Sequence, residues 1–289
     1  MGRRGSLAAL LIVLTGAADT PQLREARWTV ASARVQALTK QPGECLRRDK
    51  DPGAIAIGRV ASRTPLLFGG QAARARLSCN SCHRSGRGNA HFVFPGVSGT
   101  PGTADVTASL LSSHRGDGVF NPMPIPNLVS DAPKVARHDL RAFIRGLVVE
   151  EFDGPEPTAA TLDGLTAYVA ATDATACGPD VAITLATRVA EVREAVHAAT
   201  QVSDAPTARL MLAGARDTLG LIGERYAGLS AERALIRRLD AGLHGFQRDL
   251  DRGRLPRISR WLATLNDAEP RLRAAESRSL FNPDRLARL

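Results

Sequence analysis

Apolar residues recur every three or four positions in four stretches of the C-terminal third of the chain. This spacing places side chains on one face of a helix, so each stretch predicts an amphipathic helix. In chain order the apolar positions are Ile183, Leu185, Val189, Val192 and Val196; Leu210, Leu212, Leu219, Ile222 and Tyr226; Leu235, Ile236, Leu239, Leu243, Phe246 and Leu250; and Ile258, Trp261, Leu262, Leu265 and Leu272. Four consecutive helices of this kind favour an antiparallel bundle over residues 179–289.

Polar residues and prolines indicate where these helices begin and end. Ser203, Asp204 and Pro206 precede the second helix, and Ser230 lies where a cap of the third is expected. Pro270 falls within the fourth pattern. It predicts a break there, because proline lacks the N–H that a helix interior needs.

Residues 45–178 show a different pattern and form a separate predicted unit. A short helix is expected over 77–83, followed by a loop over 85–132 that is rich in Gly, Pro, Ser, Thr and Asn. Loops of this length inside a compact domain are usually functional. Two helices close the unit. Their inward positions are Val135, Leu140, Phe143, Ile144 and Leu147 in the first and, in a helix that starts near Thr161, Leu162, Leu165, Tyr168 and Val169 in the second.

The composition supports an all-α fold. The chain has 289 residues, abundant Ala and Leu, and only 4% aromatic residues, which favours packed helices over a β-sandwich. The formal charge of +9 comes largely from arginines that are dispersed along the chain. With no nucleic-acid motif beside them, DNA or RNA is disfavoured as a partner. An acidic protein or an anionic membrane surface remains as a partner for this positive charge.

Residues 1–18 have the pattern of a signal peptide. Arg3 and Arg4 precede an apolar run from Leu7 to Leu14, and Gly16-Ala17-Ala18 offers a cleavage site. The run is short for a membrane span, although an uncleaved anchor is the alternative. We therefore expect a periplasmic protein whose mature chain, without a transmembrane segment, begins with an N-terminal segment over 19–44.

The most specific motif is Cys79-Asn80-Ser81-Cys82-His83, the attachment signature of haem c. Two thiols on one turn can add to the two vinyl groups of a single porphyrin, and the adjacent histidine is then presented to the iron. A zinc site or a dithiol redox centre is the alternative for a Cys-x-x-Cys pair. Zinc needs a second close ligand pair, and a thioredoxin-like centre needs a βαβ pattern that the sequence lacks. The sequence therefore predicts one covalent haem, with iron ligated by His83.

The other two cysteines, Cys45 and Cys177, flank the haem unit. We expect them to form a disulfide, since thiols outside the cytoplasm tend to oxidise. Two unpaired buried thiols are the alternative.

The sixth iron ligand decides the chemistry of the haem, because a thioether gives an electron carrier and an open position admits peroxide or a gas. Met123, flanked by Pro122 and Pro124, is the methionine of this unit and a candidate ligand. An ordinary apolar contact with the porphyrin is the alternative for it.

Other side chains compete for the haem. His114, among turn-forming residues, is a rival ligand or acid–base group, and His91 lies close enough in sequence to reach the iron. Arg115 is a candidate partner of a haem propionate. His138, on a helix beside Asp139, is expected to be solvated.

Leu66-Leu67-Phe68-Gly69-Gly70, the attachment signature, and the segment from Val106 to Gly118 together resemble the haem domains of bacterial dihaem cytochrome c peroxidases and their methylamine-utilisation relatives. The resemblance covers about residues 55–178. It implies a cytochrome c-type haem domain with a long haem-wrapping loop. Those peroxidases carry two attachment motifs, and this chain has one. If the chain reduced peroxide, Glu150 or Glu151 would be candidate acid–base groups.

The predicted bundle carries no metal-site motif. Its histidines, His197 and His244, fall on separate helices, and no Glu-x-x-His pair is present. It is expected to be a structural or docking unit, whose basic face could recruit an acidic redox partner.

Three functions follow from these patterns. The first is a monohaem electron carrier with His83 and Met123 as ligands. The second is a peroxidase-like haem enzyme or haem sensor with an open distal site. In the third, the haem stabilises an adaptor whose work is done by the bundle.

Overall fold

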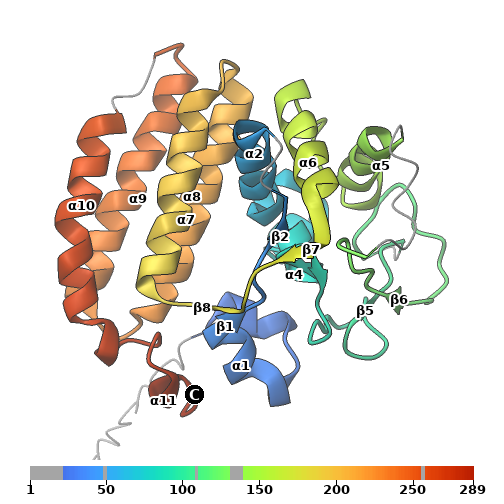
Figure 1. Ribbon diagram of the computed structural model, residues 1–289, viewed down its shortest axis with the longest axis horizontal. Helices are drawn as coiled ribbons and strands as arrows, with labels where there is room; N and C mark the ends of the chain where they lie inside the picture. Colours follow the sequence, from blue (N-terminus) through green and yellow to red (C-terminus); the bar gives the residue numbers. More distant parts are fainter. Residues whose placement is uncertain (1–21, 48–50, 108–109, 131–138, 255–257) are drawn as a thin grey trace, which may run out of the picture.

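The structure, a computed structural model, describes residues 22–47, 51–107, 110–130, 139–254 and 258–289. It is mainly α-helical, as the sequence predicted (Figure 1). The signal-peptide residues 1–18, Val135 and His138 lie outside the described residues. No helix among the described residues is long and apolar enough to cross a membrane.

The α-helices are α1 (Arg34–Thr39), α2 (Pro52–Arg63), α3 (Gly70–Arg74), α4 (Cys79–Cys82), α5 (Leu140–Gly146), α6 (Ala159–Ala171), α7 (Leu185–Gln201), α8 (Ala205–Arg225), α9 (Ser230–Leu250), α10 (Ile258–Ala274) and α11 (Pro283–Leu286). The strands are β1 (Lys40–Gln41), β2 (Cys45–Leu46), β3 (His83–Arg84), β4 (Arg87–Gly88), β5 (Thr103–Ala104), β6 (Met123–Pro124), β7 (Thr172–Cys177) and β8 (Val181–Ala182). They pair antiparallel as β1–β8, β2–β7, β3–β4 and β5–β6.

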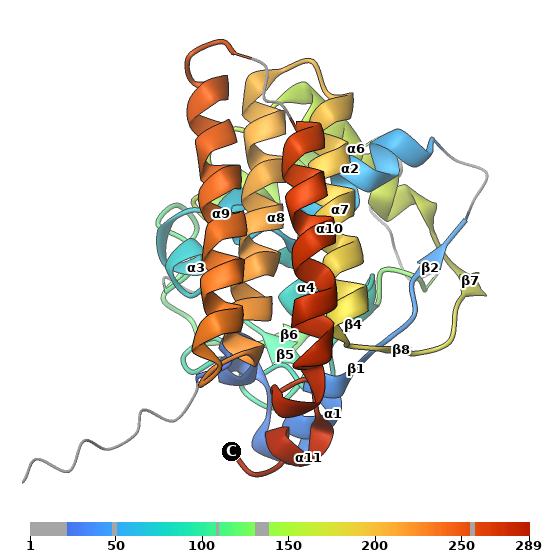
Figure 2. The same cartoon turned by 90° about the vertical axis from the view of Figure 1, so that its left-hand side faces the viewer.

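Helices α7 to α10 pack side by side as a four-helix bundle (Figures 1 and 2). Caps define where two of them begin. The Thr184 side chain accepts the N–H of Thr187 at the start of α7, and Asp204 accepts the N–H of Thr207 at the start of α8. The predicted cap of α9 is wrong, because Ser230 is already the first helical residue.

The predicted break at Pro270 is also wrong, since α10 continues to Ala274. Proline removes one backbone hydrogen bond from a helix interior. Leu265, Ala268 and Leu272 are buried on both sides of it, and Tyr226 donates its hydroxyl proton to the carbonyl oxygen of Leu272 at 2.6 Å. Burial of this face keeps the segment helical.

In the predicted unit over residues 45–178 the expected helices are present with altered ends. The helix predicted over 77–83 is reduced to the single turn of α4, and the first closing helix, α5, continues into a π-helical turn over Leu147–Glu151. Phe143 is 47% exposed rather than inward. Thr158 caps α6, whose Leu162, Leu165 and Tyr168 are buried as predicted.

Helix α2 joins the rest of the unit over residues 45–178 to the bundle. On one side it crosses α6 so closely that a Cβ on Gly58 would lie 2.0 Å from the carbonyl oxygen of Gly164. On its other side it contacts α7 and α8, where Val60 and Thr64 lie against Gly214. A single hydrophobic core therefore runs through both predicted units, from Leu77 and Phe92 to Leu219 and Leu265.

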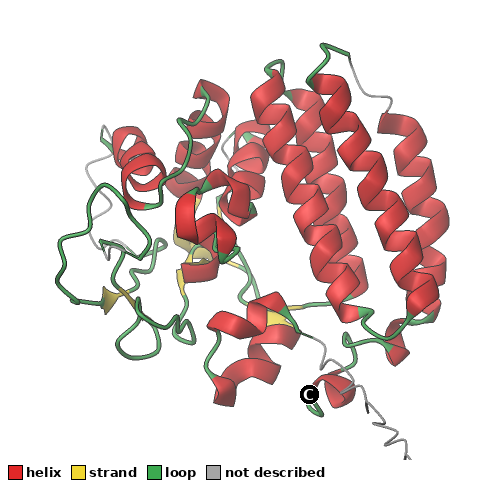
Figure 3. Cartoon of the chain, turned by 180° about the vertical axis from the view of Figure 1, so that it is seen from behind, coloured by secondary structure: helices red, strands yellow, loops and turns green. Residues whose placement is uncertain are grey.

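The helical part of the N-terminal segment over 22–46 lies at one end of the molecule, below both units, where Figure 1 labels α1 and Figure 3 shows the same place from behind. Thr29 forms an antiparallel β-bridge with Phe92, and the Val93 N–H donates to the Trp28 carbonyl. Cys45 forms the predicted disulfide with Cys177 where β2 meets β7. These contacts bind the N-terminal segment to the unit over residues 45–178.

Buried charges reinforce this junction. Glu25 accepts hydrogen bonds from Arg188 of α7 at 2.8 and 3.0 Å. Burial alone would raise the pKa of Glu25, but Arg188 and neighbouring arginines outweigh it and lower the pKa to about 2. Arg24 pairs with Asp217 at 2.6 Å and with Glu224, both on α8. The segment is therefore locked to the bundle by ion pairs with little solvent exposure.

Candidate functional site

Helix α4 presents Cys79 and Cys82 on one short turn. A capping box fixes the turn, because the side chains of Ser78 and Ser81 each accept the other's backbone N–H. Both thiols are half-buried, pack against the main core and are not linked to each other. Burial raises the pKa of each thiol to about 12, so both stay protonated near neutral pH.

The hairpin after α4 fixes the position of the next residue, His83. Strands β3 and β4 are joined by a tight turn at Ser85 and Gly86, both with positive φ. Asn89 holds this hairpin against the motif: its backbone N–H donates to the Cys82 carbonyl at 2.8 Å, and its side-chain amide donates to the Ser81 carbonyl at 2.9 Å. The five motif residues are therefore held by backbone contacts on both sides.

The imidazole of His83 is oriented by a backbone carbonyl. Its Nδ1 lies 3.1 Å from the carbonyl oxygen of Pro126 and donates to it. Burial lowers the pKa of His83 to about 4, so the ring is neutral at pH 7. With the proton on Nδ1, the lone pair on Nε2 is free for a metal. The segment carrying Pro126 is itself anchored, since the Leu128 N–H donates to the Gly86 carbonyl at 3.0 Å.

This donor set suits a group that takes two thioether bonds and one imidazole nitrogen. The chain's remaining cysteines, Cys45 and Cys177, are bonded to each other and so do not complete a four-cysteine metal site with Cys79 and Cys82. Across the described residues, no three His, Cys, Asp or Glu side chains form a group that could hold a metal ion. Two thiols and one imidazole nitrogen are the donors that covalent haem attachment would need, and the motif supplies all three.

Met123, the candidate sixth ligand, lies in β6 opposite Ala104 of β5. Its side chain is 68% exposed. It is three residues from Pro126, whose carbonyl oxygen accepts the hydrogen bond from Nδ1 of His83. Three residues span about 10 Å at most, so the same short segment serves His83 and carries Met123.

The structure brings His114 and Arg115 to acidic residues. His114 is 59% exposed and its Nδ1 lies 3.1 Å from Oδ1 of Asp153. Arg115 pairs with Glu150 and, at 2.7 Å, with the buried Glu151. Oε2 of Glu151 is buried with no hydrogen-bond partner among the described residues.

His91 is positioned by its backbone. Its carbonyl accepts the Val30 N–H at 2.9 Å, and its own N–H donates to Asn89 Oδ1 at 3.1 Å. The side chain is half-buried. The backbone of His91 therefore binds the N-terminal segment through Val30.

Sequence reasoning missed the contribution of the N-terminal segment to the site. Arg84, next to His83, donates to the carbonyl of Lys40 at 3.1 Å and to that of Ala37. A cavity of about 70 Å³ is lined both by residues of the motif, such as Ser81, and by residues of the N-terminal segment, such as Trp28. The basic residue after the histidine was visible in the sequence, but its partners are backbone carbonyls, which leave no sequence signal.

Comparisons with known proteins give no further guide to the site. No family model, no curated protein and no solved structure matches the chain.

Proposed function

We propose that the chain is an exported c-type cytochrome that holds one haem and carries single electrons to or from a protein partner. The observation that supports this best is the pairing of two unlinked thiols on one turn with a neutral, oriented imidazole. Cys79 and Cys82 would attach the haem, and Nε2 of His83 would bind its iron. When bound, haem c supplies one-electron redox chemistry.

The surrounding residues have defined tasks in this proposal. The Pro126 carbonyl, by accepting the Nδ1 proton, holds the ring in one tautomer and makes Nε2 a stronger donor. Asn89 and the Ser78–Ser81 capping box keep the two thiols at the spacing of one turn. Val119 and Phe120, both more than half exposed, lie on the segment leading to Pro126 and would offer apolar cover to a porphyrin face.

In the electron carrier, Met123 would be the second protein ligand of the iron. Its exposed side chain would be available for this role. Met123→Ala should then lower the reduction potential and open the iron to added ligands.

A second candidate function is a peroxidase-like enzyme or haem sensor with an open sixth position. It is favoured because two side chains that could otherwise contact the haem already have acidic partners. His114 pairs with Asp153, and Arg115 pairs with Glu150 and Glu151. Glu151, buried with one free oxygen, would be the group that moves a proton. In this reading Met123→Ala leaves the potential and the spectrum unchanged.

We also propose a periplasmic location. The predicted signal peptide and the Cys45–Cys177 disulfide support an oxidising compartment. The redox partner is proposed to be acidic, since the chain carries a formal charge of +9.

The visible absorption spectrum of the haem-loaded protein, oxidised and reduced, with and without carbon monoxide, distinguishes the two functions. A low-spin spectrum with a sulfur–iron charge-transfer band and no response to carbon monoxide supports the electron carrier. A high-spin ferric spectrum, or ready binding of carbon monoxide, supports the open site. Failure of the exported protein to acquire any haem would contradict both functions.

A further inference from the structure

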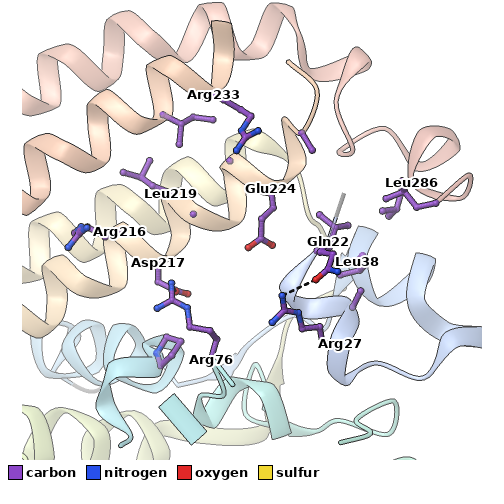
Figure 4. A pocket seen from close by; sticks show the side chains of 18 of the residues that line it. Gln22, Arg27, Leu38, Arg76, Arg216, Asp217, Leu219, Glu224, Arg233 and Leu286 are labelled. Carbon is purple, nitrogen blue, oxygen red and sulfur yellow. Dashed lines mark hydrogen bonds and ion pairs between the residues drawn. The ribbon is translucent and has the colours of Figure 1, made fainter. Parts of the chain in front are cut away.

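A wide cleft lies between the bundle and the N-terminal segment (Figure 4). One wall is formed by α8 and α9, the other by residues 22–38, and Leu286 of α11 lies at one end. Its volume is about 1560 Å³. Small-molecule pockets usually occupy about 300–1,000 Å³, so the cleft is better matched to a length of polypeptide.

The acidic groups in the cleft are already neutralised. Asp217 and Glu224 pair with Arg24, and Asp240 pairs with Arg216 at 2.7 Å. Arg76, three residues before Cys79, adds a second contact to Asp217 at 3.3 Å. The carboxylates thus contribute little net negative charge to the cleft.

Four arginines remain on its walls: Arg27 and Arg34 from the N-terminal segment and Arg233 and Arg237 from α9. All four are exposed, and none has a carboxylate within ion-pair distance in the described part of the chain. Arg27 donates only to the side-chain oxygen of Gln22, at 3.1 Å. Figure 4 shows Arg27 and Arg233 on opposite walls. Positive charge therefore faces the cleft from both sides.

Apolar side chains accompany these arginines. Leu66, Leu289 and Val35 line the cleft and are 54%, 51% and 40% exposed, while Leu219 and Ile236 are buried in its floor. A ligand that fits must combine negative charge with apolar groups.

We propose that the cleft is the docking site for an acidic, amphipathic segment of a partner protein. Its Asp or Glu side chains would meet the four wall arginines, and its apolar side chains would cover the leucines between them. This rests on the proposed function only in taking the partner to be the redox partner, because no cleft residue belongs to the attachment motif.

Other occupants fit the cleft less well. Residues 1–21 of the chain carry Arg3 and Arg4 against a single acidic residue, Asp19, so their charge does not complement the walls. A second copy of this basic chain would be repelled. A lipid surface is broad and flat, whereas the arginines face one another across a concavity.

The test uses the full chain and a fluorescently labelled amphipathic peptide built of Glu and Leu, with a peptide carrying Lys in place of Glu for comparison. The Glu peptide should bind, and at about 1 M salt, where the Debye length is only about 3 Å, binding should weaken at least about tenfold. Arg233→Glu/Arg237→Glu should weaken binding at low salt by a similar factor, as should Arg27→Glu/Arg34→Glu on the other wall.

The matched control is Arg238→Glu/Arg248→Glu, which changes two exposed arginines of α9 that lie outside the cleft. It alters the net charge equally and should change the affinity less than about twofold if the site is local. Helical circular dichroism confirms that each variant is folded. Equal losses in the cleft and control pairs, or equal binding of the Lys peptide, would overturn the proposal.

Two further measurements separate the alternatives. If the cleft variants lose binding to anionic vesicles, or lose self-association, while peptide binding is unchanged, the cleft is not a peptide site. Peptide binding by haem-free Cys79→Ala/Cys82→Ala supports the cleft independently of the proposed function. Loss of peptide binding in that variant, with the fold intact, counts against it.

Discussion

The bundle and the attachment region, that is α4, β3 and β4 around the Cys79–His83 motif, are built by different means. In the bundle, long helices bury continuous apolar faces, and residues such as Leu219, Leu243 and Leu265 are almost fully buried. In the attachment region the elements are a four-residue helix and two-residue strands, held by hydrogen bonds from Asn89 and to Pro126. Regular helices therefore provide most of the buried apolar surface, while individual polar contacts position the candidate site.

Despite this difference the two regions share one core. Helix α2 packs against α6 on one side and against α7 and α8 of the bundle on the other. The N-terminal segment also forms ion pairs with the bundle and backbone hydrogen bonds with His91 and Val93, which follow the attachment region in the chain.

The largest effect is expected from deleting residues 179–289. This exposes the bundle-facing side of α2, including Val60, and removes the partners of Arg24 and Glu25. The truncated chain should lose its cooperative unfolding transition and aggregate, as measured by circular dichroism and size-exclusion chromatography. A soluble, helical fragment that still attaches haem would show that the regions are independent domains.

The next largest effect is expected from Arg188→Met. It leaves the carboxylate of Glu25 without its closest cation, which should lower the free energy of unfolding by about 3–5 kcal/mol in urea denaturation. The double variant with Glu25→Gln should recover part of the loss, because Glu191, the other carboxylate paired with Arg188, then keeps only its contact with Arg63 at 3.5 Å. As a control, Arg193→Met removes a partly exposed pair with Glu269 and should cost about 1 kcal/mol or less. Equal costs for the two single variants would contradict a special role for the junction.

Removing the disulfide should cost somewhat less. Cys45→Ser/Cys177→Ser opens a link between residues 132 positions apart, and the free energy of unfolding should fall by about 2–4 kcal/mol. Reduction of the wild-type protein under native conditions should give the same change. An unchanged denaturation midpoint in both experiments would mean that the link adds nothing to the junction.

The last effect is confined to acid. Because the pKa of Glu25 is lowered to about 2 in the folded protein, its stabilising contribution is complete above its ordinary pKa near 4.5. It should be lost progressively as the pH falls from there towards 2. Glu25→Gln should therefore flatten the pH dependence of unfolding in this window and leave its slope above pH 5 unchanged. An identical slope in wild type and variant below pH 4.5 would exclude Glu25 as the cause.

The bundle was predictable because its information is local. Buried positions such as Leu239, Leu243 and Leu272 follow from periodicity alone, and Asp204 lies where a cap was expected. The break predicted at Pro270 failed because burial on both sides outweighs one missing hydrogen bond. Phe143 has helical spacing yet is exposed, since its face of α5 is not covered by another described element.

The candidate site was predictable only in part. Cys79, Cys82 and His83 are adjacent in sequence, so their proximity required no tertiary information. The Pro126 carbonyl and the contact of Arg84 with the N-terminal segment depend on chain segments that meet only in the folded protein. The arginines of the cleft were visible as dispersed charge, and the fold alone gathers them on facing walls.

The intact mass of the full chain, produced in a host that attaches haem to exported proteins, tests the central claim most directly. The account predicts a mass that exceeds the polypeptide by one haem and survives reduction and denaturation, with the increase absent in Cys79→Ala/Cys82→Ala. A chain that carries no added haem, with both thiols still free to react, would contradict it.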